Sequence, residues 1–131
     1  MLWFVHVVAL ADALALGVKA GVDAPTLAHV IGRSAGASWV AAHDLPNILS
    51  GNDDESFTLA LCRKDLALIA ELADDVGVEA PLAELARARF ECAYARFGPP
   101  AGELAVARLA EEAAGVSIRA PAHEEGRWRR G

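Results

Sequence analysis

The chain has little of what marks several common classes of protein. Among its 131 residues are only two cysteines, Cys62 and Cys92, whereas small secreted scaffolds carry more cysteines at close spacing. Gly-X-Y repeats and glutamine tracts are absent, as is a Cys/His cluster with zinc-ligand spacing. The net charge is −6, and no basic stripe precedes the last few residues. These absences argue against a disulfide scaffold, a fibrous chain, a zinc site and a nucleic-acid-binding protein.

Hydrophobic residues are plentiful, at 54 % of the chain, which is ample for a folded core. The length fits one domain, since domains cluster at about 100–150 residues. No segment alternates between apolar and polar residues as a half-buried strand does, and no helical repeat is found. We therefore predict an all-α fold, a single helical domain of six to seven helices over 1–118.

The first residues, from Met1 to Ala11, form a strongly apolar run. A signal peptide would begin with basic residues, and a membrane span needs about 20 apolar residues, whereas His6 and Asp12 interrupt this run and Lys19 ends it. We expect a long, buried first helix over 1–20, enclosed by the others, and a cytoplasmic protein.

The remaining helices are predicted from periodicity, caps and breakers. The clearest covers 57–76, with Ser56 as its N-cap. Leucines at 61, 68 and 72 mark a second apolar face, so we expect this helix to be largely enclosed as well.

Both cysteines are expected to be buried and reduced, with a disulfide between packed helices as the alternative. The other expected elements are a helix capped by Asp23 and ending near Gly32, a short helix ending at Ala42, a second short helix from Asp44 to near Gly51, helices over 81–97 and 103–114, and a disordered tail over 119–131.

Lys64 is the main candidate functional residue. It lies within the most apolar helix, and a lysine is rarely buried without a partner. Phe57 is seven residues earlier, so the two share a face if the helix begins by Phe57, where they could hold a planar anionic ligand. The alternative is an exposed lysine that pairs with Asp65 or another neighbour. Weaker signals are the pair His43-Asp44, which ordinary capping explains, and Ser34 and Ser38 around Gly36, which could form a phosphate-binding turn.

Four segments, in order, resemble the C-terminal helical domain of the β-hydroxyacid dehydrogenases, the family of 3-hydroxyisobutyrate dehydrogenase, with a fold like the C-terminal domain of 6-phosphogluconate dehydrogenase. The first resembles the family's A-x-A-E-A-L-x-L-A-x-K-x-G-L-D helix and turn, with Asp12 in place of the glutamate. The others resemble its S-x-G-x-S-W turn, its F-x-L-x-L-x-x-K-D-L segment and its G-x-x-x-P-L turn. Together they span about 9–110. They are, in this sequence, residues 9–23, 34–39, 57–66 and 77–82.

The resemblance implies an oxidoreductase that uses NAD or NADP and acts on a small hydroxy acid. In that family an N-terminal Rossmann domain binds the dinucleotide, and the active site lies between the two domains. By resemblance Lys64 is the cofactor-contacting lysine of the K-D-L motif, and Phe57 lines the same cleft. The helical domain of the family also supplies oligomer contacts. We therefore expect a homo-oligomer or a Rossmann-domain partner, and neither nucleic acid nor membrane.

The chain also departs from the family pattern. The family's catalytic lysine and nearby asparagine precede the first helix, and Met1 starts after them. The glycine-rich Rossmann fingerprint is absent, and Glu103 and Ala105 occupy the region where the family often has aspartate followed by serine. We expect a truncated domain without a catalytic residue of its own, inactive alone. The alternative is a non-catalytic helical module that self-associates through its first helix.

Overall fold

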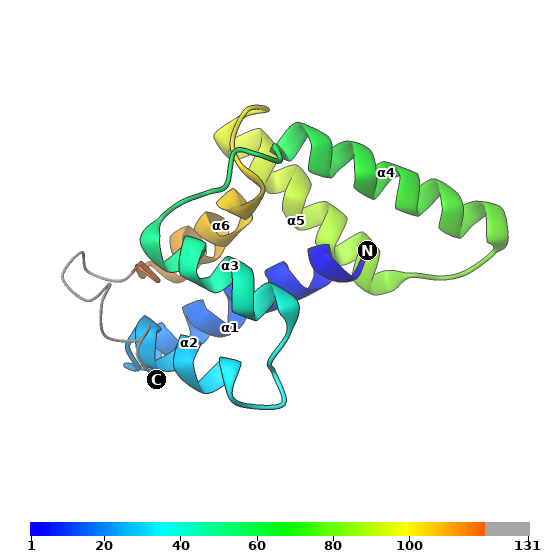
Figure 1. Cartoon of the computed structure of the whole chain (residues 1–131). Helices are drawn as coiled ribbons and strands as arrows, with labels where there is room; N and C mark the ends of the chain where they lie inside the picture. Colours follow the sequence, from blue (N-terminus) through cyan, green and yellow to red (C-terminus); the bar gives the residue numbers. More distant parts are fainter. Residues whose placement is uncertain (120–131) are drawn as a thin grey trace.

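The computed structural model describes residues 1–119, and over this range the fold is all-α, as predicted (Figure 1). Apart from the helices, the described residues contain one isolated β-bridge, between Thr58 and Gly102. The predicted tail lies outside the described residues from position 120 onward. The helices are α1 (Leu2–Lys19), α2 (Ala24–Gly32), α3 (Trp39–Ser50), α4 (Leu59–Val76), α5 (Pro81–Phe97), the 3₁₀ helix η1 (Glu103–Ala105) and α6 (Val106–Ala114).

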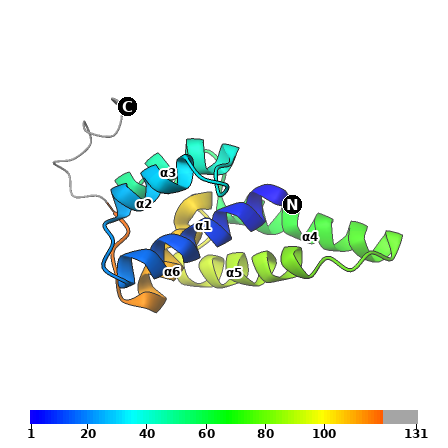
Figure 2. The ribbon, with the colours of Figure 1, turned by 90° about the horizontal axis from the view of Figure 1, so that it is seen from below.

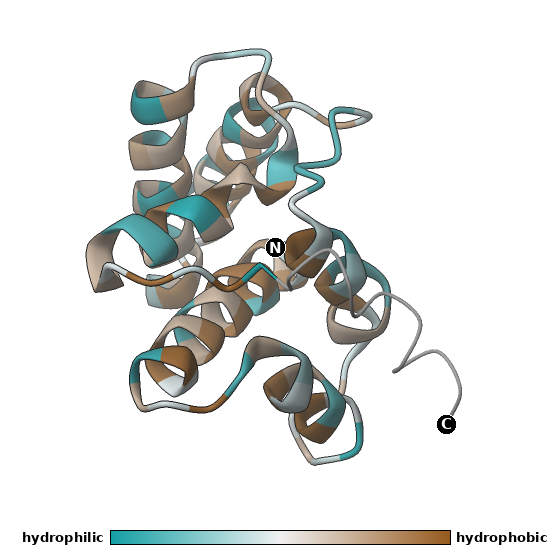
Figure 3. Ribbon diagram, turned by 90° about the vertical axis from the view of Figure 1, so that its left-hand side faces the viewer, coloured by the Kyte–Doolittle hydropathy of each residue, from teal (hydrophilic) through white to brown (hydrophobic). Residues whose placement is uncertain are grey.

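Helix α1 lies at the centre and contacts α2, α3, α5 and α6 (Figure 2). Hydrophobic residues recur along its ribbon (Figure 3), and Phe4 packs edge-on against Phe90 of α5, with ring centroids 5.2 Å apart. Leu2 and Leu16, however, are 65 % and 73 % exposed, so the helix is only partly enclosed. By length and composition alone α1 could cross a membrane, but its contacts with four helices are those of a core helix.

Helix α3 corrects the prediction of two short helices, because it runs unbroken through Pro46. A proline inside a helix removes one backbone hydrogen bond, at a cost of about 3 kcal/mol. Val40, Leu45 and Ile48 of the same helix are buried in the core, and burial of each such side chain contributes about 1.5–3 kcal/mol. Packing therefore outweighs the broken hydrogen bond, which local sequence signals alone could not show.

Helix α4 begins at Leu59, two residues later than predicted, and Thr58 rather than Ser56 occupies its N-cap position. The backbone before it is extended and pairs with a distant segment. The Leu59 N–H donates to the Ala101 carbonyl (2.8 Å), and the Phe57 carbonyl accepts from the Glu103 N–H (2.9 Å). Phe57 therefore precedes the helix, and the condition under which it would share a helical face with Lys64 is not met.

Helices α4 and α5 form an antiparallel hairpin whose far end projects away from the rest of the domain (Figures 1 and 2). The expected enclosure of α4 is wrong: Leu61, Leu68 and Leu72 are 40 %, 52 % and 62 % exposed. The far half of the hairpin has only its partner helix to cover it, so one apolar face of α4 stays open.

Three smaller predictions have different outcomes. Both cysteines are free thiols, but Cys92 is exposed on α5 and only Cys62 is buried. The predicted Asp23 cap is confirmed, since its carboxylate accepts from the Thr26 N–H at 2.9 Å. The helix predicted over 103–114 is divided into η1 and α6.

Candidate functional site

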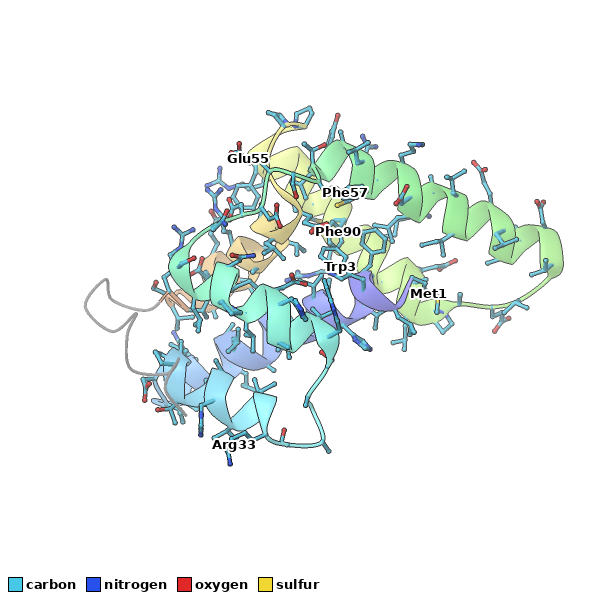
Figure 4. All side chains as sticks on the ribbon, viewed as in Figure 1. Met1, Trp3, Arg33, Glu55, Phe57 and Phe90 are labelled. Atoms are coloured by element: carbon cyan, nitrogen blue, oxygen red, sulfur yellow. The ribbon has the colours of Figure 1, made fainter. Side chains whose placement is uncertain are left out.

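An open cleft of about 410 Å³ lies where the N-terminal end of α1 meets α3, the segment before α4, and η1. Trp3 and Phe57 lie near one another in this region (Figure 4). Half of the lining is aromatic and half is acidic. The lining residues are Trp3, Phe4, Trp39, Asp44, Asp54, Phe57, Asp65 and Glu103.

The aromatic side of the cleft is held by contacts between distant helices. The indole Nε1–H of Trp3 donates to the Asp44 carboxylate at 2.9 Å and ties the start of α1 to α3. Trp39, 64 % exposed, stacks on the ring of His43 one turn later, with centroids 4.0 Å apart. The His43 ring is thus occupied within α3, where its Nδ1 also lies 2.9 Å from the Trp39 carbonyl oxygen.

The acidic side is built by a loop that docks on η1. The Leu104 N–H donates to the Asp53 carbonyl at 2.9 Å, and Arg108 pairs with the Asp53 carboxylate at 3.0 Å. Gly102 allows this contact, since a Cβ there would lie 2.1 Å from the Asp53 carbonyl oxygen. Asp54 follows in the left-handed region, with φ of 52°, and its carboxylate accepts from the Ser56 N–H.

Two of these carboxyl groups hold protons more tightly than usual. Burial raises the pKa of Asp44, against the opposing hydrogen bond from Trp3. Burial also raises the pKa of Glu103 to about 7, and the nearby charges of Asp54 and Asp44 add to the effect. A carboxyl that titrates near neutral pH can take up or release a proton in the cleft.

The two residues predicted for the site are placed differently. Phe57 lines the cleft, whereas Lys64 is exposed on α4 and is not among the lining residues, although Asp65 beside it is. Among the described residues no group of His, Cys, Asp and Glu side chains could hold a metal ion. The two hydroxyl groups of the possible phosphate-binding turn around Gly36 are engaged with nearby backbone groups. Ser34 Oγ accepts from the Gly36 N–H, and Ser38 Oγ accepts from the Ala41 N–H and caps α3.

Of the eight lining residues, reasoning from the sequence named only Phe57 as a site residue, and three of those it missed show which signals were available. Trp39 closes the S-x-G-x-S-W segment, so the motif could have pointed to it. Glu103 stands in the region where the family often has aspartate followed by serine, and this departure could have pointed to it as a site residue. Trp3 donates a hydrogen bond to Asp44, 41 residues later, and packs against Phe90 of α5, and no local pattern signals such contacts.

The arrangement selects for certain ligands. Aromatic faces stack against planar rings, while four carboxyl groups repel phosphates and favour a neutral or cationic ring. A volume of about 410 Å³ falls within the range of small-molecule sites. The cleft therefore suits a planar, uncharged or cationic group and not a polyanion.

Comparison with known proteins supports the resemblance. Residues 1–110 match the family model described as NAD-binding of NADP-dependent 3-hydroxyisobutyrate dehydrogenase. The chain is 36 % identical over 86 residues to an L-threonate dehydrogenase of Cupriavidus necator, covering 66 % of this chain and 29 % of that protein. It is 32 % identical over 114 residues to a 2-(hydroxymethyl)glutarate dehydrogenase of Eubacterium barkeri, covering 86 % and 38 %.

The fold has a counterpart among solved structures. The crystal structure of a 3-hydroxyisobutyrate dehydrogenase from Salmonella typhimurium matches with a TM-score of 0.77 and 28 % identity, covering 82 % of this chain and 38 % of that one. The chain thus spans between 29 % and 38 % of the length of these three relatives.

Proposed function

The chain belongs to the NAD-binding family of the NADP-dependent 3-hydroxyisobutyrate dehydrogenases, and we propose that it forms the helical half of a site that oxidises a small 3-hydroxy acid. The aromatic and acidic cleft that contains Phe57 carries this proposal. A Rossmann domain would complete the site, and the assembled enzyme would work in the cytoplasm.

The cleft residues fit the nicotinamide end of NAD or NADP. When bound, the cofactor accepts a hydride from the carbon that bears the substrate hydroxyl. Trp39 and Phe57 offer ring faces for stacking, and the carboxylates favour the cationic ring of the oxidised form. The same carboxylates disfavour the pyrophosphate, which a Rossmann domain holds at a helix N-terminus.

Lys64 supplies a positive charge near the edge of this acidic region. It is exposed and directly precedes Asp65, which lines the cleft. An ammonium group at that position can bind a phosphate or ribose oxygen that extends out of the cleft. We assign Lys64 and Phe57 to the cofactor, and no residue of this chain to the catalytic proton transfer.

The test measures binding of NADH and NADPH by tryptophan fluorescence, with the chain mixed with the Rossmann half of a relative. Lys64→Ala should weaken binding about tenfold, since a charge-assisted hydrogen bond contributes about 1.5–3 kcal/mol. Lys19→Ala is the matched control, because that ammonium donates to the Ala114 carbonyl at the far end of α1. Equal binding by the two variants would refute the role of Lys64.

Turnover measurements test whether this chain needs a Rossmann domain for catalysis. The chain alone should oxidise no hydroxy acid, and addition of the Rossmann half should restore turnover. Turnover by the isolated chain would show that its own residues suffice for catalysis, contrary to the proposal.

The exposed leucines of α4 favour a second candidate, a helical self-association module without catalysis. A stable homodimer that binds neither cofactor, with or without the Rossmann half, would support this alternative over the dehydrogenase.

A further inference from the structure

The cleft at the start of α1 carries negative charge that the described part of the chain leaves unpaired. Its four carboxyl groups belong to Asp44, Asp54, Asp65 and Glu103. Five ion pairs join side chains within residues 1–119, and none of them includes one of these four groups. Like charges that lie close together repel one another. A cationic group that enters the cleft is therefore attracted by all four carboxylates.

Asp44 gives the inner wall of the cleft an acceptor that is still free. The residue is only 6 % exposed although it lines the cleft. Its Oδ2 accepts from the Trp3 indole N–H at 2.9 Å, whereas no donor among the described residues is bonded to its Oδ1. No fully buried side-chain oxygen in the described range lacks a partner, so Oδ1 faces the open space of the cleft. A guanidinium N–H is the strongest donor that a protein chain offers to such an oxygen.

The aromatic side of the cleft is also open. One face of Trp39 stacks on His43, yet Trp39 remains 64 % exposed, and Phe57 beside the loop is only half-buried. An indole ring or a guanidinium group stacks well on an exposed tryptophan. The cleft therefore suits a peptide segment that contains both arginine and tryptophan.

The chain itself contains such a segment, Arg127-Trp128-Arg129-Arg130. We call it the basic segment. Three of the twelve Lys and Arg residues lie within these four positions, around one of the three tryptophans, and no other four consecutive residues contain three cationic side chains. The composition of the basic segment thus complements both sides of the cleft.

The last described residue lies close enough to the cleft for the basic segment to reach it. A Cβ on Gly51 would lie 3.0 Å from Arg119 Nη1, so the described chain ends beside the C-terminal end of α3 (Figure 1). Asp44 is seven residues before Gly51, about 10 Å along the helix, and Asp54 is three residues after it, at most about 10 Å away. Eight positions separate Arg119 from Arg127 and span up to about 26 Å. The tether therefore reaches the cleft with length to spare.

The tether also favours the cleft over the other acidic region of the domain. The tip of the α4–α5 hairpin carries Asp74, Asp75 and Glu79, but it lies at the opposite end of the domain from the last described residues (Figures 1 and 2). A short tether holds a segment at an effective concentration on the order of 1 mM near its attachment point. A dissociation constant of about 0.1 mM would then keep the cleft about nine-tenths occupied.

From this match of charge, aromatic surface and tether length we infer that the basic segment binds in the cleft of its own chain. Trp128 packs against the open face of Trp39, and the arginines pair with the carboxylates. The chain thereby closes its own cleft, and any ligand of the cleft must displace the basic segment. The inference goes beyond the proposed function, because it requires only the cleft and the basic segment, whether or not a nicotinamide ring enters the same space.

Paramagnetic broadening in the full chain tests the inference. A nitroxide is attached at Gly131→Cys in a Cys92→Ser background, since Cys62 is fully buried and escapes the label. In ¹⁵N spectra the label should broaden the Phe57 amide and leave the Val78 amide at the hairpin tip unchanged. A sharp Phe57 signal, or equal broadening at both positions, would overturn the inference.

Substitutions in the basic segment separate docking from mere proximity, because the tether keeps its length. Each arginine replaced by serine should weaken docking about threefold, so a chain with Arg127→Ser, Arg129→Ser and Arg130→Ser should lose most of the broadening at Phe57. These positions lie outside the described fold, and the thermal unfolding of residues 1–119 should be nearly unchanged. Undiminished broadening in the triple variant would contradict the role of the arginines.

Substitutions in the cleft test the other side of the contact. Asp65→Asn with Glu103→Gln should weaken docking about tenfold and remove about half of the broadening. Asp75→Asn with Glu79→Gln is the matched control, since it removes the same two charges from the exposed hairpin tip, and it should have no effect. Equal effects of the two pairs would overturn the cleft as the binding site. Broadening of an unlabelled ¹⁵N chain by an added spin-labelled ¹⁴N chain, as strong as within one chain, would overturn binding within the same chain.

Discussion

Glu103 offers the sharpest test of the electrostatics of the cleft. Burial and the charges of Asp54 and Asp44 raise the pKa of Glu103 from 4.5 to about 7. This shift corresponds to a penalty of about 3 kcal/mol for ionising the carboxyl in the folded state. Because the side chain is only partly buried, solvent screening reduces this to about 2 kcal/mol. Below pH 4.5 the carboxyl is protonated in both the folded and unfolded states, so there is no penalty. Above pH 7 it is charged in both, and the full penalty applies to the folded state.

Glu103→Gln removes the titration while keeping the shape of the side chain. We expect the free energy of unfolding to be about 2 kcal/mol higher than that of the parent chain at pH 8, and nearly equal to it at pH 4.5. Urea unfolding followed by tryptophan fluorescence at both pH values measures the difference. Glu55→Gln, on the exposed loop of the same cleft, should change stability by less than about 0.5 kcal/mol at either pH. If the gain for Glu103→Gln is the same at both pH values, the raised pKa is wrong.

Three further predictions concern the buried core, the loop contact beside the cleft and the two cysteines. Phe90→Ala removes a fully buried ring that packs on the aromatic end of α1, and should lower the free energy of unfolding by about 3–5 kcal/mol in urea titrations. Gly102→Ala forces a Cβ to 2.1 Å from the Asp53 carbonyl oxygen, so the free energy of unfolding should fall by about 3 kcal/mol. A fall of less than about 1 kcal/mol would show that the loop moves away without strain. A thiol reagent should modify Cys92 alone in the native chain and both cysteines in denaturant, because Cys62 is buried and burial raises its pKa to about 12; rapid modification of two native thiols would contradict this.

Reasoning from the sequence succeeded where structure depends on near neighbours. The Asp23 cap and the bounds of α5 follow from side chains and breakers within a few residues. The four motifs predicted the family, which the comparisons confirmed. Phe57 does line the cleft, but the helical face used to argue for it does not exist, and its contact with a cofactor stays a prediction.

Reasoning from the sequence failed where distant segments meet. The start of α4 is set by pairing with residues 101–103, and Trp3 is held by Asp44 on another helix. The interpretation of the leucines in α4 failed for a related reason. An apolar stripe predicts that a face prefers burial, but whether another element covers it depends on how far the hairpin projects.

The sequence by itself thus determined the all-α class, most helix bounds and the family, because hydrogen bonds within helices and capping act over three or four residues. Only the tertiary structure decided that Pro46 stays inside a helix, that the cleft is aromatic on one side and acidic on the other, and that one face of the hairpin is left open. Each of these depends on contacts between residues tens of positions apart, whose free energies outweigh local preference.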